Sequence, residues 1–270
     1  MCSSAADGAG TASFAVVSCP VAGLRARANP RSEMVNQEVF GRRLVVEEAR
    51  ADWVLCRPEG GNASSRGWVP RRCLAPAPRY RPTHTVVKRF ASLHLVDGGA
   101  LVLPFGSLVE ARGGHGASLA ARLPGGGVGR IKPGALERPG EARADLRRFR
   151  VLARQVVGTP YLWGGKSTFG FDCSGLVQVL FGLLGVDLPR NSGEQARTGR
   201  PVRDLSRLQP LDLVFFGTGT AIDHVAIHTG NLSILHASGF VRFESLDPAS
   251  DVFRADLSAR FRLARRFTHL

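Results

Sequence analysis

The chain has 270 residues and 44% of them are hydrophobic, so it can bury a sizeable core in one large domain or in two to three small ones. Its formal charge of +14 favours an anionic partner such as nucleic acid, acidic lipid or a carboxylate-rich peptide. The basic residues are scattered, and no Lys/Arg-rich run is interleaved with aromatic residues, which argues against a nucleic-acid groove.

The cysteines and the start of the chain bear on the compartment. Five cysteines at irregular spacing do not indicate a disulfide framework, and the absence of a CxxC pair argues against structural zinc. Residues 1–15 are expected to be a flexible tail that lacks the charged and apolar regions of a signal peptide. No stretch is long enough to span a membrane. We therefore expect a cytoplasmic monomer; a periplasmic or secreted location would require a start site further upstream.

Two segments with similar patterns come first. Residues 16–78 alternate short apolar runs with turn signals, as at 44–46, 53–55 and 67–70. Residues 79–139 repeat this pattern, with Gly-rich breaks at 125–127. Short strands at this spacing are typical of small antiparallel barrels, so we expect two all-β modules. The Pro-rich residues 75–78 between them are expected to form a stiff linker.

The pattern changes in residues 140–270. Apolar residues recur at three- and four-residue intervals from Leu146 to Val156, which predicts a helix that ends at Gly158. A second helix is expected to begin near Cys173. Strand-like segments follow at 213–216, 224–228, 233–237 and 261–267. Helices followed by a run of strands predict an α+β domain.

Cys173 lies where a loop enters the second helix. Free backbone N–H groups and the positive end of the helix dipole lie there and favour a thiolate, so we expect a lowered pKa for this cysteine. Asp172 or Ser174 could cap the helix.

A nucleophilic thiol needs an imidazole that takes up its proton and later protonates the leaving group. His224 and His236 lie in two neighbouring strand-like segments, and antiparallel pairing of these segments would bring them together. One could then act as the base while the other orients it. His228 shares the strand face of His224 and is a competing candidate, although a turn at the surface is the other place expected for it.

Six motifs resemble, in order, the NlpC-type cell-wall cysteine peptidases. They are Pro-Tyr-Leu-Trp-Gly-Gly at 160–165, Phe-Asp-Cys-Ser-Gly at 171–175, Leu-Pro-Arg-Asn-Ser at 188–192, Asp-Leu-Val-Phe-Phe at 212–216, Asp-His-Val-Ala-Ile at 223–227 and Leu-His-Ala at 235–237. The resemblance covers residues 140–270. It implies a papain-like fold and hydrolysis of the bond between γ-D-glutamate and a diamino acid in murein peptides, without a cofactor.

The resemblance also implies roles for single residues. By it, Cys173 is the nucleophile, His224 the base and His236 the orienting third residue. Tyr161 matches the family tyrosine near the oxyanion site, while Asp172 and Ser174 match positions that line the substrate pocket.

The two β modules resemble bacterial SH3-like domains, as in the recycling endopeptidases that take peptides with a free N-terminal L-Ala. By this resemblance Glu33 matches an acidic residue that binds the free amine. The chain departs from the pattern at two positions: Ser65 stands where a tyrosine is expected, and Asn191 stands before Ser192 where an acid is common. The loss of an acid weakens recognition of an ammonium group.

Three other hypotheses are open at this point. The β modules could hold wall peptide beside a catalytically weak domain, or the acyl-enzyme could be resolved by another nucleophile, as in an acyl transferase. Cys173, His224 and His236 could also bind zinc, although a cysteine at a helix start beside Ser and Gly suits a nucleophile better.

Overall fold

The computed structural model describes residues 13–77, 79–113, 117–140 and 145–267. The first β module is a seven-stranded antiparallel sheet with the strand order β3-β2-β6-β5-β4-β1-β7. Its strands are β1 (Ser13–Val17), β2 (Val21–Arg25), β3 (Met34–Val39), β4 (Arg43–Ala49), β5 (Trp53–Pro58), β6 (Gly67–Pro70) and β7 (Leu74–Pro76). Residues 13–15 pair with β4, so the expected tail boundary at residue 15 is wrong; residues 1–12 lie outside the described residues.

The second β module repeats this arrangement. Its strand order is β10-β9-β13-β12-β11-β8-β14, which is the first order with seven added to every strand number. Its strands are β8 (His84–Val86), β9 (Phe90–Leu95), β10 (Ala100–Pro104), β11 (Leu108–Arg112), β12 (Leu119–Arg122), β13 (Val128–Ile131) and β14 (Leu136–Glu137). The sequence pattern repeats because the same topology is built twice.

The two modules pack together instead of being held apart by a linker. Ala75 and Pro76 belong to β7, and Ala77 is buried in the core of the second module, where Val16 and Phe40 of the first module also pack. The backbone N–H of Leu108 also donates to the carbonyl oxygen of Phe40, with 2.8 Å between N and O. The expected stiff linker is therefore wrong for residues 75–77, and Pro78 lies outside the described residues.

The rest of the chain is a helix–sheet domain. Its six-stranded antiparallel sheet has the order β17-β22-β18-β19-β20-β21. These strands are β17 (Arg200–Val202), β18 (Leu213–Thr218), β19 (Ala221–Gly230), β20 (Ser233–Ser238), β21 (Phe240–Ser245) and β22 (Phe261–Arg266). The helices are α1 (Leu146–Val156), α2 (Cys173–Leu183), α3 (Ser192–Gln195) and α4 (Ala255–Ala259), and β15 (Lys166–Ser167) pairs with β16 (Gly170–Phe171).

The sheet is covered on both faces. Apolar residues of α1 and α2 pack against alternate residues of β18 to β20, such as Phe215, Val225 and Leu235. The intervening residues, such as Val214 and Phe216, pack against Leu257 of α4. The two expected helices and the strands at 213–216, 224–228, 233–237 and 261–267 are present, but β17 and β21 were not expected.

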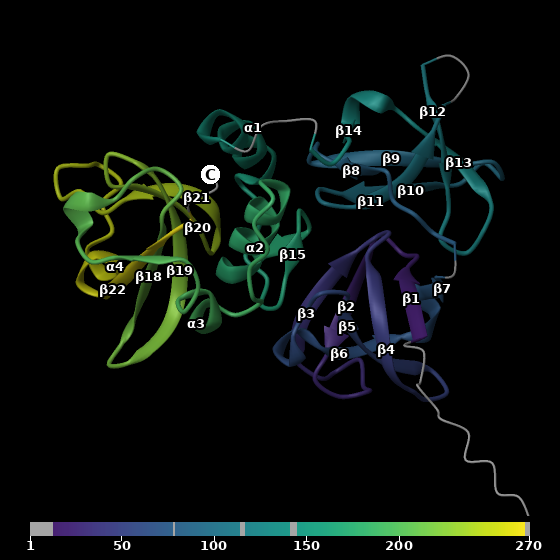
Figure 1. Cartoon of the computed structure of the whole chain (residues 1–270), viewed down its shortest axis with the longest axis horizontal. Coiled ribbons are helices and arrows are strands. Elements are labelled where there is room, and N and C mark those ends of the chain that lie inside the picture. The colour runs from purple at the N-terminus through teal and green to yellow at the C-terminus, as the bar shows by residue number, and fades with distance from the viewer. Residues whose placement is uncertain (1–12, 78, 114–116, 141–144, 268–270) are drawn as a thin grey trace, which may run out of the picture.

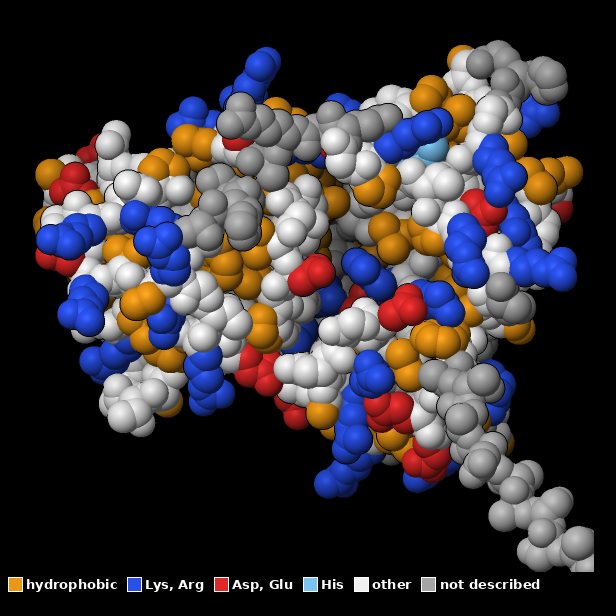
Figure 2. Space-filling view, viewed as in Figure 1, with side chains coloured by type: hydrophobic (Ala, Val, Ile, Leu, Met, Phe, Trp, Pro, Cys, Tyr) orange, Lys and Arg blue, Asp and Glu red, His pale blue; other side chains and the backbone are white. Residues whose placement is uncertain are grey.

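The three parts meet around α2. Figure 1 shows α1 and α2 between the six-stranded sheet on one side and the two β modules on the other. Phe105 of the second module is fully buried in the core of the helix–sheet domain. Lys and Arg side chains are spread over all three parts on the face shown in Figure 2. Among the described residues, no helix has the length and apolarity needed to cross a membrane.

Candidate active site

Cys173 is the first residue of α2, and Asp172 is the residue that caps this helix. The Asp172 carboxylate accepts hydrogen bonds from the backbone N–H of Gly175 at 2.6 Å and of Gly164 at 2.9 Å. The sulfur of Cys173 accepts from the backbone N–H groups of Val225 and Ser174. Because Val225 follows His224 in β19, the thiol lies beside the strand that carries the predicted base.

The environment of Cys173 works against the thiolate. Burial and then the charge of Asp172 raise its pKa to about 11, although the two backbone N–H groups and Arg190 act in the opposite direction. The expectation of a lowered pKa at the helix start is therefore wrong for this structure. Desolvation, which disfavours the charged form, outweighs the helix dipole at a thiol that is only 8% exposed.

His224 and His236 meet as the strand pairing predicted. They lie on β19 and β20, which are joined by a turn at Asn231 and Leu232 with φ of 50° and 56°. His224 Nε2 and His236 Nδ1 are 2.9 Å apart, and the two rings are nearly perpendicular, at 86°. Burial, then the charge of His236, lowers the pKa of His224 to about 3. Burial also lowers the pKa of His236, against the effect of Glu244.

His228 has a different environment. It is buried at 2% exposure, and its Nδ1 lies 2.8 Å from the carbonyl oxygen of Gln209. It lies within β19 and not in a surface turn, so that expectation is wrong. Its contact with Gln209 links β19 to the segment before β18.

Glu244 was missed by the sequence analysis. Its Oε2 lies 2.6 Å from His236 Nε2, so a carboxylate contacts the far side of the histidine pair. Glu244 belongs to β21, a strand that the sequence pattern did not reveal. An acidic residue eight positions after His236 was the only signal in the sequence.

Arg190 was also missed, although it lies inside a recognised motif. Arg190 is 2% exposed and forms a bidentate hydrogen-bonded ion pair with Asp172. Its Nη1 donates to Oδ1 at 3.0 Å and its Nη2 to Oδ2 at 2.5 Å. Its Nη1 also donates to Ser174 Oγ at 2.9 Å. Its Nε donates to Asn36 Oδ1 in the first β module at 2.8 Å. Arg190 therefore fixes both residues that flank the thiol and connects them to β3.

The predicted pocket residues nearest the thiol are Tyr161, Asp172 and Ser174. Tyr161 forms an isolated β-bridge with Phe171, two residues before Cys173, and burial, then the charges of Cys173 and Asp172, raises the pKa of Tyr161 to about 12. Asp172 and Ser174 are 6% exposed, and both are held by Arg190. The structure therefore brings these three side chains together around Cys173.

The remaining predicted pocket residues lie further out. Glu33 is exposed, and its Oε1 accepts a hydrogen bond from Trp163 Nε1 at 2.8 Å. Asn191 is exposed at the start of α3, where its side chain makes no capping hydrogen bond, and Ser192 follows it. Ser65 is buried and its Oγ donates to the Asn62 carbonyl at 2.6 Å.

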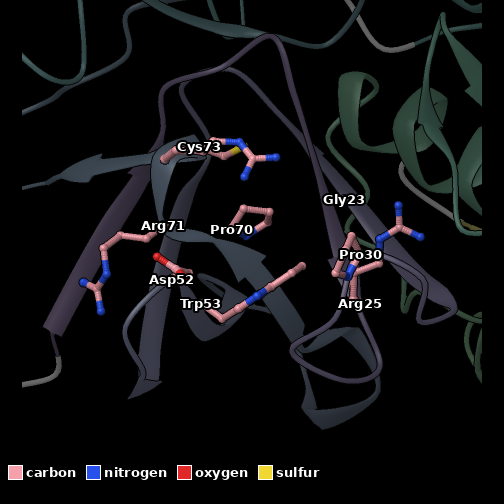
Figure 3. Close-up of a pocket in the computed structure, with 9 residues that line it drawn as sticks. Gly23, Arg25, Pro30, Asp52, Trp53, Pro70, Arg71 and Cys73 are labelled. Atoms are coloured by element: carbon pink, nitrogen blue, oxygen red, sulfur yellow. The ribbon is translucent and has the colours of Figure 1, made fainter.

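Two pockets in the described part of the chain have linings that do not include Cys173. Figure 3 shows one of them, which lies in the first β module and is lined by Arg25, Trp53 and Cys73 among others. Within the described ranges, no three His, Cys, Asp or Glu side chains are grouped to hold a metal ion.

Comparison with known proteins identifies a family and several similar proteins. The model of the NlpC/P60 family matches residues 158–254. The gamma-D-glutamyl-L-lysine dipeptidyl-peptidase of Bacillus cereus is 28% identical over 230 residues, which are 76% of this chain and 68% of that protein. The dipeptidyl-peptidase 6 of Lysinibacillus sphaericus is 27% identical over 276 residues, which are 90% of this chain and 96% of that protein.

A solved structure supports the fold over nearly the whole chain. The crystal structure of an NlpC/P60 family protein from Bacillus cereus has a TM-score of 0.83 and 21% sequence identity, and the match covers 94% of this chain and 99% of that one. Residues 158–254 therefore match the NlpC/P60 family, a family of cysteine-type peptidases.

Proposed function

We propose that the protein hydrolyses the bond between γ-D-glutamate and a diamino acid in murein peptides, in the recycling of cell-wall material. The observation that carries this proposal is the pairing of His224 with His236, since the residue after His224, Val225, donates its backbone N–H to the thiol of Cys173. The substrate class is taken from the similar proteins named gamma-D-glutamyl-L-lysine dipeptidyl-peptidase.

In the proposed reaction Cys173 is the nucleophile, His224 the base and His236 the residue that orients it. Because His236 occupies Nε2 of His224, Nδ1 is the ring nitrogen that can take the thiol proton. The sulfur attacks the γ-carbonyl carbon, and the imidazolium then gives the proton to the departing amine as the C–N bond breaks. Water, activated by the same imidazole, releases the acyl group and restores the thiol.

The start of α2 and Tyr161 suit the charge that develops in this reaction. Thiol and imidazole are both neutral before the substrate binds, since the pKa of Cys173 is raised to about 11 and that of His224 is lowered to about 3. The proton therefore moves as the sulfur attacks. We propose that the Tyr161 hydroxyl donates to the oxyanion, which is the group most strongly stabilised in acyl transfer.

We further propose that both β modules are SH3-like, that the helix–sheet domain is papain-like, and that the first module closes one end of the substrate cleft. Glu33 would face the substrate's free amine from this module, while Asp172, Ser174, Asn191 and Ser192 would line the opposite side. The support is the contact between Glu33 and Trp163, which joins the module to the segment that carries Tyr161.

The test is incubation with L-Ala-γ-D-Glu-diaminopimelate and with its N-acetylated form, followed by chromatography of the products. We expect release of diaminopimelate from the free peptide by the wild-type protein and none by Cys173→Ala. Slower cleavage of the acetylated peptide would support recognition of the amine. Equal cleavage of both would refute that part and keep the peptidase, whereas no cleavage of either would refute the proposed substrate class.

A further inference from the structure

Glu244 ends a chain of contacts that begins at the proposed base. His224 Nε2 is 2.9 Å from His236 Nδ1, and His236 Nε2 is 2.6 Å from Glu244 Oε2. His236 is fully buried and the Glu244 side chain is 12% exposed, so water competes little for either contact. Of the four ring nitrogens of His224 and His236, three therefore have a partner in these two contacts, and His224 Nδ1 is the fourth.

The contacts determine where each proton lies. A carboxylate can only accept hydrogen bonds, so the proton between His236 and Glu244 belongs to His236 Nε2. Neutral His236 then has a bare Nδ1, which accepts from His224 Nε2. Neutral His224 consequently carries its proton on Nε2 and has a bare Nδ1, which is the state that a base for the thiol requires.

The Glu244 carboxylate balances the positive charges of two arginines that surround it. Arg254 Nη1 lies 2.5 Å from its Oε2 and Arg242 Nε lies 3.0 Å from its Oε1. Arg254 also pairs with Asp256 at 2.8 Å, and Arg260 pairs with Asp223 on β19. Without the Glu244 charge, two guanidinium groups would face His236 and would disfavour formation of the imidazolium on His224.

We propose that Glu244 is a positioning residue of this active site, which sets the tautomers of His236 and His224 and stabilises the imidazolium through His236. The proposal rests on the proposed function only for its kinetic test. Glu244 acts indirectly, like the third member of a catalytic triad, but it contacts the orienting residue His236 and not the base itself.

The experiment compares Glu244→Gln with wild type. We expect kcat for the murein peptide to fall about 100-fold, the lower end of what a positioned general base contributes, with little change in KM. In the His236→Ala background the same substitution should cause no further loss, because Glu244 acts through His236. Imidazole ¹⁵N spectra should show a bare Nδ1 on His224 in wild type and a mixture of tautomers in the variant.

The matched control is Glu47→Gln. Glu47 is also held by two arginines, Arg57 at 3.1 Å and Arg66 at 3.7 Å, but it lies in the first β module. The control should leave kcat and the ¹⁵N spectra unchanged. A Glu244→Gln variant with wild-type tautomers, or one with a further loss in the His236→Ala background, would overturn the proposal. If wild type cleaves no murein peptide, the ¹⁵N spectra still decide the role of Glu244.

A second, independent feature is a pair of thiols in the first β module. The backbone N–H of Ser18 donates to the Cys73 carbonyl at 2.9 Å, continuing the pairing of Val17 with Leu74. Cys19 follows immediately, its Sγ donates to the Val21 carbonyl at 3.2 Å, and the Cys19 and Cys73 side chains pack against the same core. Both are free thiols and partly exposed.

The two thiols differ in reactivity. The neighbouring Cys19 thiol and the charge of Arg72 lower the pKa of Cys73 to about 7, against the effect of burial, whereas the pKa of Cys19 is raised. Cys73 lines the pocket in Figure 3, together with Arg25 and Arg71. A thiolate with a pKa near neutrality in a basic pocket is suited to exchange with an anionic disulfide.

We infer that Cys19 and Cys73 form a disulfide by exchange with a small anionic disulfide such as oxidised glutathione. The Cys73 thiolate attacks the disulfide and expels one small thiolate, giving a mixed disulfide. Cys19 then loses its proton, attacks the Cys73 sulfur and expels the second small thiolate. Two protein thiols are oxidised and one small disulfide is reduced to two thiols.

Incubation of the full chain with oxidised glutathione, followed by mass spectrometry, tests this inference. Wild type should lose two hydrogen atoms, and peptide mapping should join Cys19 to Cys73. Cys19→Ser should stop at a glutathione adduct on Cys73, and Cys73→Ser should form neither product. Cys2→Ser, whose site lies outside the described residues, should react as wild type does. Free Cys19 and Cys73 in treated wild type, or an adduct on Cys19 alone, would overturn the inference.

Discussion

The neighbours of Cys173 have opposing effects on the pKa of its thiol. Its position at the start of α2 and the N–H groups of Val225 and Ser174 favour the thiolate, but burial and Asp172 prevail. Because the pKa of His224 is also lowered, to about 3, a resting ion pair of thiolate and imidazolium is disfavoured. At neutral pH Cys173 is therefore a neutral thiol and His224 a neutral imidazole.

This resting state predicts how alkylation of Cys173 depends on pH. Iodoacetamide reacts with the thiolate, whose fraction rises about tenfold per pH unit below the pKa. With a pKa of about 11, the alkylation rate should keep rising through the whole alkaline range in which the protein stays folded. The rate is measured by mass spectrometry of the peptide that contains residue 173, and Cys173→Ala identifies this signal. A rate that is already constant around neutral pH would contradict the prediction and indicate an ion pair.

At the scale of elements, the sequence predicted best those helices and strands whose apolar residues recur at a regular spacing. The spacing of apolar residues predicted α1 and α2, and the antiparallel pairing of β19 with β20 predicted that His224 and His236 meet. β21 was missed because its buried and exposed residues do not alternate, with Phe240 and Phe243 both exposed beside buried Val241. Glu244 was missed with it, and so was the last contact of the histidine chain.

Gly164 joins two elements and gives a prediction at this scale. Its φ is +76°, and a Cβ atom would lie 2.3 Å from the carbonyl oxygen of Met34 in β3. Gly164→Ala should therefore strain the backbone and also displace β3, whose residues Asn36 and Gln37 bind the helix–sheet domain. We expect a loss of more than about 1 kcal/mol in the free energy of unfolding and a lower kcat/KM, measured by urea denaturation and peptide hydrolysis.

The control for this change is Gly185→Ala. Gly185 has a similar φ of +80°, but nothing lies within 4 Å of its added Cβ. The Gly185→Ala variant should lose only about 1 kcal/mol of unfolding free energy, because of backbone strain, and should keep the wild-type kcat/KM. If both variants lose the same stability and activity, the close approach of Gly164 to β3 has no consequence of its own.

At the scale of the whole molecule, buried polar groups connect the first module to the catalytic domain. Gln37 Oε1 accepts from the Lys166 N–H at 3.0 Å and from Ser167 Oγ at 2.8 Å. Glu38 pairs with Lys166 at 2.7 Å, and Asn36 accepts from Arg190 at 2.8 Å. These partners are more than 125 residues apart in the chain and have no local pattern, so the sequence could not predict them.

The Glu38–Lys166 pair predicts how stability changes with pH. Burial holds the pKa of Lys166 below the 10.5 of a free lysine, and Glu38 opposes this lowering. Glu38→Gln removes the partner and leaves a buried, unpaired ammonium group, so we expect a loss of about 3–5 kcal/mol near neutral pH. The folded-state pKa of Lys166 falls further in the variant, while the unfolded chain still binds the proton up to 10.5. Between these two values stability rises with pH, so the loss should shrink as the pH approaches 10.5.

Urea denaturation of Glu38→Gln and wild type at several pH values from neutral to alkaline measures this loss. The control is Glu59→Gln, because Glu59 pairs with Arg43 at 3.5 Å while its side chain is 48% exposed. An exposed pair contributes at most about 1 kcal/mol, so the control should lose little at every pH. A Glu38→Gln deficit that stays constant with pH would mean that the loss comes from packing and not from the charge of Lys166. In the expected case, the charge on a single lysine couples the pH to the docking of the first module on the catalytic domain.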